Sequence, residues 1–232
     1  MRQLLVVDLG RQAYADTLVF QREVARARIA GSVDEDVLLL VEHAPVITLG
    51  RSSKSAHMLA TPEYLRQQGV ELFEVERGGD VTFHGPGQLV GYPIIDLKQH
   101  KRDLHWYLRQ VEEFLIKALA TYELAGTRRA PYTGVWIDDR KIASIGVHAR
   151  DWVTWHGFAL NVTTDLRYFD LIVPCGIPAV RMTSIAAEKP NEPVELTDVA
   201  QRVVAAVADV FALTPHRTAP TDLAYAATGA GR

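Results

Sequence analysis

The stretch from Gly134 to Val162 has the sequence GVWIDDRKIASIGVHARDWVTWHGFALNV, and it decides the fold. Apolar runs alternate with short polar segments, which is the pattern of strand, turn, strand, turn, strand. Only antiparallel neighbours can be joined by such short turns, since parallel strands need a long crossover. The stretch therefore predicts a sheet that is mixed but largely antiparallel.

Helical and extended segments are expected on both sides of this stretch. Helices are predicted where apolar residues recur at helical spacing, with Gly31 ending the first, Thr61 and Asp103 capping two others and Thr197 capping the last. We expect strands at Gln3–Leu9, a pair at Asp36–Glu42 and Val46–Leu49, and one at Val70–Glu76, and helices at Gln12–Ala30, after Thr61, from Asp103 to about Leu124 and at Leu196–Leu213.

The chain shows no internal repeat and no linker that would separate two halves. We therefore predict a single α/β (α+β) domain over residues 1–213, with helices covering the sheet. A flexible tail is expected from residue 214 to residue 232, because its residues are small and polar.

Composition excludes several classes of protein. The 232 residues include 25 Lys and Arg and 28 Asp and Glu, so the formal net charge is −3, which favours neither nucleic acid nor an anionic membrane. The apolar runs, such as Val37–Val41, are far shorter than the ~20 residues that cross a bilayer, and no signal peptide is evident. With one cysteine, Cys175, no internal disulfide can form, and we expect a cytoplasmic protein.

A glycine-rich segment extends from Arg77 to Gln88. Its glycines let a backbone approach a ligand closely and leave amide N–H groups free, although the dinucleotide and Walker patterns are both incomplete. If the middle of the segment is extended, Thr82 and His84 share one face, and Val81 and Phe83 share the other. Glycine content alone also fits a turn with a hydrogen-bonded histidine.

Lys141 begins an alternating apolar run that continues to Val147. Period-two alternation places it on the same face as Ala143 and Ile145. A lysine on such a face either extends its ammonium group into water at the strand end or is desolvated for chemistry. Extension into water is the commoner case among lysines.

Cys175 lies in a constrained turn, Pro174-Cys175-Gly176-Ile177-Pro178. Free cysteines are usually buried and inert, but a turn of this kind can direct the thiol into a cleft. A thiol with a pKa near 8.5 is about 3% ionised at pH 7, so a nucleophilic Cys175 needs a cationic partner. Lys141 could supply that charge, in which case the two groups titrate as a pair.

Other catalytic centres have little support in the sequence. The eight histidines are scattered and one cysteine cannot build a structural zinc site, so we expect no metal. A Ser-His-Asp hydrolase lacks the Gly-x-Ser-x-Gly turn.

Four segments, in this order and spacing, resemble the lipoyl(octanoyl) transferases. They are Arg77–Gln88, Lys141–Gly146, His156–Val162 and Pro174–Ile177, and the resemblance extends from about Leu4 to Leu213. One departure is Phe83, where many members of the family have tyrosine.

The resemblance implies the fold of the biotin and lipoate protein ligase superfamily. It also implies a cytoplasmic acyltransferase that moves an octanoyl group from octanoyl-acyl carrier protein to a lysine of a lipoyl domain, the first step of protein lipoylation. The acceptors would be the lipoyl domains of 2-oxoacid dehydrogenase complexes and the glycine cleavage H protein. No cofactor, nucleic acid or membrane is implied, and we expect a monomer.

The family's site residues transfer to matching positions of this chain. The resemblance implies that Cys175 is the acyl-thioester nucleophile and that Lys141 lowers its pKa. The residues implied to line the acyl substrate are Arg77, Gly78, Gly79, Asp80, Val81, Thr82, Phe83, His84, Ser144, Ile145, Gly146, Gly157, Phe158 and Ala159.

Chemical reasoning gives these positions specific tasks. The small residues Gly146, Gly157 and Ala159 would leave a groove for an eight-carbon chain. Backbone amides of the glycine-rich loop or the Cys175 turn would hold the oxyanion, Lys141 would carry the protons, and His84 would bind substrate. Docking of acidic partner domains would use a rim of arginines, namely Arg128, Arg129, Arg140 and Arg150.

Three competing functions remain at this point. An ATP-dependent lipoate or biotin ligase would not need Cys175. A non-catalytic module that binds acyl carrier or lipoyl domains would not need both Cys175 and Lys141. A cysteine hydrolase would normally pair its cysteine with histidine.

Overall fold

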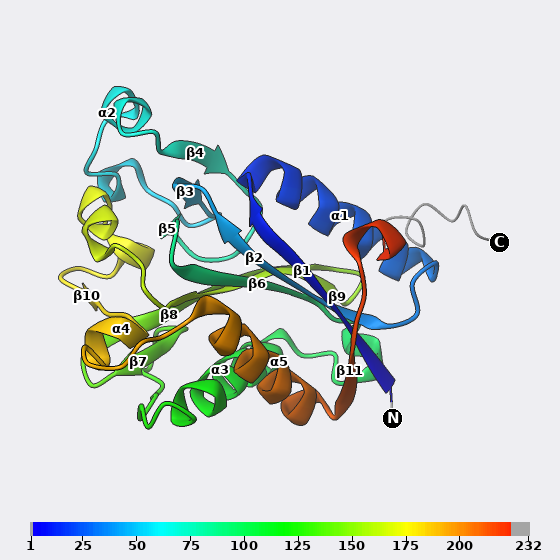
Figure 1. The fold of residues 1–232 in the computed structure, drawn as a ribbon. Coiled ribbons are helices and arrows are strands. Elements are labelled where there is room, and N and C mark those ends of the chain that lie inside the picture. Colours follow the sequence, from blue (N-terminus) through cyan, green and yellow to red (C-terminus); the bar gives the residue numbers. More distant parts are fainter. Residues whose placement is uncertain (1, 224–232) are drawn as a thin grey trace.

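The computed structural model describes residues 2–223, and its centre is an eight-stranded mixed sheet (Figure 1). Its strands lie in the order β10-β8-β9-β6-β2-β1-β11, with β7 paired to β8. They are β1 (Arg2–Gln12), β2 (Asp36–His43), β6 (Gln88–Ile94), β7 (Val135–Ile137), β8 (Arg140–Arg150), β9 (Val153–Asn161), β10 (Arg181–Met182) and β11 (Leu213–Arg217).

The centre of this sheet is antiparallel, as predicted. β8 pairs with β9, β9 with β6, and β6 with β2, all in antiparallel register, while the outer pairs β2–β1 and β1–β11 are parallel. The tight turn at Asp151, between β8 and β9, produces the longest antiparallel ladder, which runs from the Ala143–Leu160 pair to the Arg150–Val153 pair.

A smaller sheet has the order β4-β3-β5, with β3 (Val46–Leu49), β4 (Glu71–Glu74) and β5 (Val81–His84). The prediction that the segments 36–42 and 46–49 pair with each other was wrong, because β2 belongs to the main sheet and β3 to the small one. Pro45 lies in the turn between them and cannot donate to a ladder, so the chain changes sheets there.

Helices cover both faces of the main sheet (Figure 1). On one face α3 (Leu104–Ala120) and α5 (Leu196–Phe211) pack with the largest apolar cluster, and the α5 stripe Val199, Val203 and Val207 is fully buried. On the other face α1 (Tyr14–Ala30) packs against β6 and β9. Two short helices, α2 (Pro62–Gln67) and α4 (Ile185–Glu188), lie outside these layers.

Helix boundaries follow side-chain capping at most of the predicted places. Thr61 accepts the Tyr64 N–H and Asp103 accepts the Trp106 N–H, and Gly31 ends α1 in the left-handed conformation. Thr197 was wrongly predicted as the cap of the last helix, because it lies inside α5, which begins at Leu196 directly after Glu195.

The segment after Leu213 is not the flexible tail that we expected, as far as Leu223. Residues 213–217 form β11, which pairs in parallel with β1, and the Thr218 N–H donates to the Val6 carbonyl. Leu223 is buried against the α1 side of the core. The backbone hydrogen bonds of an edge strand outweigh the polar character of this sequence; residues 224–232 lie outside the described part.

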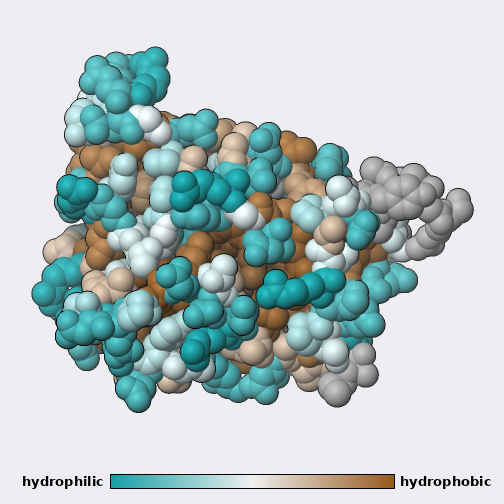
Figure 2. Space-filling model, viewed as in Figure 1, coloured by the Kyte–Doolittle hydropathy of each residue, from teal (hydrophilic) through white to brown (hydrophobic). Residues whose placement is uncertain are grey.

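The surface is mixed in character. Figure 2 shows hydrophilic residues over α2 at the upper left, whereas apolar residues are visible across the middle of the same face. Among residues 2–223, no helix has both the length and the apolar character needed to cross a membrane.

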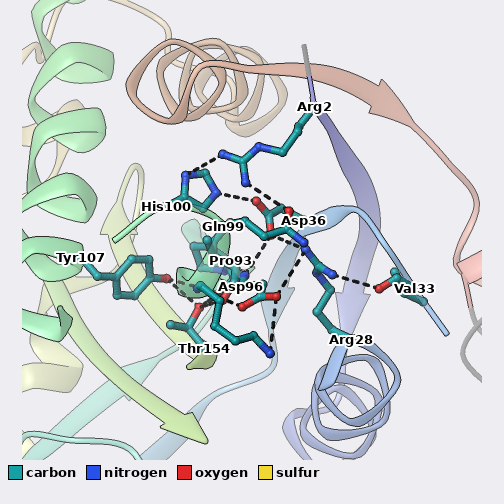
Figure 3. Close-up of polar contacts among 12 residues, drawn as sticks. Arg2, Arg28, Val33, Asp36, Pro93, Asp96, Gln99, His100, Tyr107 and Thr154 are labelled. Atoms are coloured by element: carbon teal, nitrogen blue, oxygen red, sulfur yellow. Dashed lines mark hydrogen bonds and ion pairs between the residues drawn. The ribbon is translucent and has the colours of Figure 1, made fainter. Parts of the chain in front are cut away.

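A buried polar network fixes the ends of β1, α1 and β2 at one edge of the molecule (Figure 3). The Asp36 carboxylate accepts the Asp96 N–H at 2.9 Å and lies 2.7 Å from His100 Nε2. Arg28 lies 3.4 Å from the same carboxylate and also donates to the Val33 carbonyl. Because these charges are buried, each one depends on its partners.

Replacing Asp36 with alanine is expected to destabilise the fold by about 3–5 kcal/mol, because the buried Arg28 guanidinium loses its nearest carboxylate. Urea unfolding of both proteins measures the difference. Asp34→Ala, at an exposed position two residues earlier, is the control and should change stability by less than about 0.5 kcal/mol. Equal stabilities for the two variants would contradict the structural role of the network.

Candidate active site

Lys141 and Cys175, which are 34 positions apart in sequence, lie in direct contact. The distance from Lys141 Nζ to Cys175 Sγ is 3.0 Å. The Lys141 side chain is fully buried, and its ammonium lies 5.1 Å from the centre of the Trp136 ring. This arrangement excludes extension of the lysine into water, which was the alternative left open by its position on a strand.

A β-bulge in β8 directs Lys141 towards the cysteine. Trp136 on β7 pairs with Lys141, whereas the preceding Val135 pairs with Ala143, so Ile142 is an extra residue in the ladder. One extra residue reverses which face the following side chains occupy. The prediction that Lys141 shares a face with Ala143 was therefore wrong: Lys141 instead acts together with Ser144, whose hydroxyl lies 3.8 Å from Cys175 Sγ.

The cysteine lies in the turn Pro174–Gly176 in the left-handed backbone region, with φ of 56°. A non-glycine residue in this region costs about 1 kcal/mol or more and persists only where the surroundings hold it. Gly176 follows with φ of 65°, and a Cβ at Gly176 would lie only 2.4 Å from Asp80 Oδ2. Two independent features, the backbone angle and the close carboxylate, therefore favour glycine directly after Cys175.

Two cations act on the thiol. Burial by itself would raise the pKa of Cys175, but the Lys141 ammonium, the Ser144 hydroxyl and the Arg77 guanidinium outweigh it, and the pKa is lowered. Arg77 is buried and donates to the Thr48 carbonyl at 2.7 Å. The lowered pKa favours the thiolate form of Cys175.

Removing the ammonium should make the thiol less reactive. In Lys141→Met the pKa of Cys175 is expected to rise, because burial remains while the main opposing charge is lost, so alkylation by iodoacetamide at pH 7 should slow at least tenfold. Cys175 is the only cysteine of the chain, so total alkylation measures this one thiol. Lys101→Met, at an exposed lysine, is the matched control, and a Lys141→Met rate like that of the control would argue against the pair.

A pocket of about 260 Å³ extends from the thiol. The predicted residues that line it are Arg77, Gly79, Asp80, Thr82, His84, Ser144, Ile145, Gly146, Gly157, Phe158, Ala159 and Cys175. Sequence reasoning missed Tyr14, Val90, Tyr92, Pro131, Tyr132, Thr133, His156 and Ile177. His156 is the first residue of the motif His156–Val162, so its position could have been predicted. The other residues belong to segments without a distinctive local pattern.

Three residues predicted to contact substrate do not line this pocket. Val81 and Phe83 are buried in the core of the small sheet, and the Phe83 ring stacks on Tyr168. The strand alternation places Thr82 and His84 on the pocket side, as expected, and thereby turns Val81 and Phe83 away. Gly78 instead donates its N–H to the Val147 carbonyl.

Gly146 serves close packing as well as space. A Cβ at this position would lie 2.8 Å from the Gly78 carbonyl and 3.1 Å from Arg77 Cδ. The absent side chain therefore lets the glycine-rich loop lie directly on β8, which places Arg77 beside the thiol.

Burial favours the neutral forms of two tyrosines and two histidines in the pocket lining. Burial raises the pKa of Tyr14 to about 12 and that of Tyr92 well above its usual value. Burial also lowers the pKa of His84 to about 3 and lowers that of His156. His84 Nδ1 lies 2.9 Å from Gln88 Oε1, a partner that the sequence did not reveal.

The neutral His84 makes stability depend on pH. Its pKa is lower in the folded chain than in the unfolded chain, so its contribution is fully present above pH 6.5 and is lost as the pH falls towards 3. Between pH 7 and pH 5 the free energy of unfolding should therefore fall by about 2 kcal/mol because of His84. Urea unfolding at both pH values measures this drop. The drop in the free energy of unfolding should be smaller for His84→Gln than for wild type by about that amount, and equal drops would contradict a neutral buried imidazole.

Two arginines of the predicted docking rim, Arg128 and Arg140, are paired with glutamates. Arg128 is bound by Glu112 at 3.0 Å and by Glu113 at 2.6 Å, and Arg140 is bound by Glu188 at 2.9 Å. Arg129 and Arg150 are exposed. Arg128 and Arg140 are therefore paired with acidic residues distant in sequence, and the docking role of the four arginines stays a prediction.

The buried Glu112 gives Arg128 a different role. One carboxylate oxygen of Glu112 accepts the Gly134 N–H at 3.1 Å, and the other contacts Arg109 and Arg128. This carboxylate anchors the loop that contributes Pro131, Tyr132 and Thr133 to the pocket. Among residues 2–223, no group of three or more His, Cys, Asp or Glu side chains is placed to hold a metal ion.

Comparisons with known proteins agree with this geometry. Residues 13–208 match the family of lipoyl protein ligase A/B catalytic domains. An octanoyltransferase from Rubrobacter xylanophilus is 50% identical over 204 residues, covering 87% of this chain and 90% of that protein. One from Chloroflexus aurantiacus is 48% identical over 219 residues, covering 93% and 97%.

Solved structures share the fold at low identity. A lipoate-protein ligase A bound with ATP has a TM-score of 0.74 at 14% identity, covering 96% of this chain and 92% of that chain. The bipartite lipoate protein ligase of Thermoplasma acidophilum has a TM-score of 0.74 at 15% identity, with 97% and 91% covered. The chain therefore belongs to the lipoyl protein ligase A/B catalytic-domain family and, within it, to the octanoyltransferases.

Proposed function

We propose that this octanoyltransferase works through an acyl-thioester on Cys175, with octanoyl-acyl carrier protein as donor and lipoyl domains as acceptors. The observation that carries the proposal is the 3.0 Å contact between a buried lysine and the thiol that lines the pocket. A reaction that proceeds through the enzyme's own thioester needs such an activated nucleophile. Both carrier substrates are expected in the cytoplasm.

In the first half-reaction the Cys175 thiolate attacks the donor thioester carbon. The tetrahedral intermediate collapses, the bond to the carrier's sulfur breaks, and Lys141 gives a proton to the departing thiolate. The product is the octanoyl-thioester of Cys175, with Lys141 left neutral.

In the second half-reaction a lysine amine of the lipoyl domain attacks the same carbonyl. Lys141 accepts the proton that the amine loses as the amide forms, and Cys175 leaves as the thiolate. The pair returns to its starting charges, so the reaction needs no further co-reactant. Ping-pong kinetics follow from this order.

The structure narrows the choice of groups that can bind the oxyanion. In the cysteine turn, the Gly176 N–H donates to the Val173 carbonyl and the Ile177 N–H donates to the Pro174 carbonyl. These amides are therefore occupied. The hydroxyl of Thr82 is buried, lines the pocket and has no hydrogen-bond partner within residues 2–223, so we assign it to the substrate carbonyl.

The pocket itself suits an acyl chain. Val90, Ile145, Phe158 and Ala159 contribute apolar surface, and the neutral phenols and imidazoles of the lining add no charge of their own. Each buried methylene contributes about 0.8 kcal/mol, so a pocket of fixed length distinguishes chains only within one or two carbons.

Intact-protein mass spectrometry tests the intermediate directly. Wild-type protein mixed with octanoyl-acyl carrier protein in the absence of ATP should gain one octanoyl group, and addition of a lipoyl domain should remove it. Cys175→Ser is the matched control and should gain no thioester. Transfer only in the presence of ATP and free octanoate would favour the ligase alternative, and binding without transfer would favour the non-catalytic module.

A further inference from the structure

The segment from His57 to Ala60 lies alongside residues 171–173, which lead into the cysteine turn. The His57 carbonyl accepts the Val173 N–H at 2.8 Å, and the Leu59 N–H donates to the Leu171 carbonyl at 2.9 Å. His57 thus contacts the backbone two residues before the nucleophile. Neither the residue patterns nor the resemblance pointed to this segment.

The His57 side chain binds a carboxylate on the other side of the same turn. Its Nδ1 lies 2.6 Å from Asp80 Oδ2, while Asp80 Oδ1 accepts the Val81 N–H at 2.7 Å. A carboxylate only accepts hydrogen bonds, so His57 Nδ1 must carry the proton. Both oxygens of this nearly buried carboxylate are therefore held by N–H donors.

The pair lies directly against the residue after the nucleophile. A Cβ added to Gly176 would lie 2.4 Å from Asp80 Oδ2, 3.0 Å from His57 Cε1 and 3.1 Å from His57 Nδ1. The turn therefore has a fixed surface on one side, made by two side chains, and a backbone hydrogen bond from the same histidine on its entry side. Such support is what a cysteine at φ of 56° requires.

Charge balance gives the pair a second task. The groups that face the Cys175 thiolate are the cations Lys141 and Arg77 and, beside Gly176, the anion Asp80 with its partner His57. A carboxylate without a hydrogen-bond donor at this position would repel the thiolate more strongly. The hydrogen bond from the His57 N–H weakens this repulsion and keeps the carboxylate directed at Gly176.

We propose that His57 is a positioning residue for Cys175, which acts through the Asp80 carboxylate and the Val173 backbone to hold the sulfur against Lys141. Its importance for acyl transfer rests on the proposed function, whereas its effect on the thiol does not. The thiol can be followed by itself, because Cys175 is the only cysteine.

The test measures the rate of iodoacetamide alkylation between pH 5 and pH 10 for four variants. In His57→Leu the N–H donor is lost, so the midpoint of the profile should move up by about one pH unit and the rate at pH 7 should fall about tenfold. His57→Asn places an amide N–H where Nδ1 stood and should stay within about threefold of wild type. His57→Gln places its amide one methylene further out and should resemble His57→Leu.

His105→Leu, at an exposed histidine at the start of α3, is the control and should match wild type. If His57→Leu does not fold, as judged by urea unfolding, the Asn and Gln variants decide the question by themselves. A wild-type profile for His57→Leu, or identical profiles for the Asn and Gln variants, would overturn the proposal.

Octanoylation from the carrier protein, measured on the same variants, separates this proposal from the proposed function. If alkylation responds as expected but neither wild type nor any variant accepts an octanoyl group, the positioning role stands and the transferase mechanism fails. If acyl transfer is normal in wild type and alkylation is unchanged by every His57 substitution, the mechanism stands and His57 has no positioning role.

Discussion

The buried contact between Lys141 and Cys175 is the interaction on which the rest of the site depends. An ammonium without solvent is costly unless an anion compensates it, and a buried thiol ionises only beside a cation. The charged form of each group therefore stabilises the charged form of the other. The bulge at Ile142, the left-handed Cys175 and the glycine that follows it all serve to bring these two side chains within hydrogen-bond distance. Each of these features is unfavourable locally and is compensated by the pair and its surroundings.

The site forms where the small sheet meets the main sheet. Arg77 and Gly78, in the segment that leads into β5, lie on β8, because Gly146 has no side chain to keep them away. This approach buries Arg77, whose guanidinium binds the Thr48 backbone and adds a second positive charge near the sulfur. Lys141 from β8 and Arg77 from the segment before β5 therefore act together on the thiol.

Charged, neutral polar and apolar side chains all line the pocket. The ionised groups, Lys141, Arg77 and Asp80, gather near the sulfur, where a thioester would change its charge during reaction. Burial keeps Tyr14 and His84 neutral, so these two lining residues add no charge of their own. At another edge of the sheet, the network around Asp36 confines its own buried charges and ties the ends of β1, α1 and β2 together (Figure 3). The polar network around Asp36 is thus separate from the polar groups around Cys175.

Local sequence determined what depends on short-range physics. The antiparallel centre followed from the turns between Gly134 and Val162, helix ends from caps such as Thr61 and Asp103, and the alternation of Thr82 and His84 from strand periodicity. The four motifs also identified the family before any geometry was known. Only the tertiary structure decided that β2 and β3 lie in different sheets, that residues 213–217 complete the main sheet, and that acidic partners neutralise Arg128 and Arg140. These outcomes depend on pairing between residues far apart in sequence, where many local conformations are nearly equal in energy and packing selects one. The same holds for the lysine: alternation alone assigned it the wrong face, and a single extra residue in β8, set by the partner strand, turned it to the cysteine.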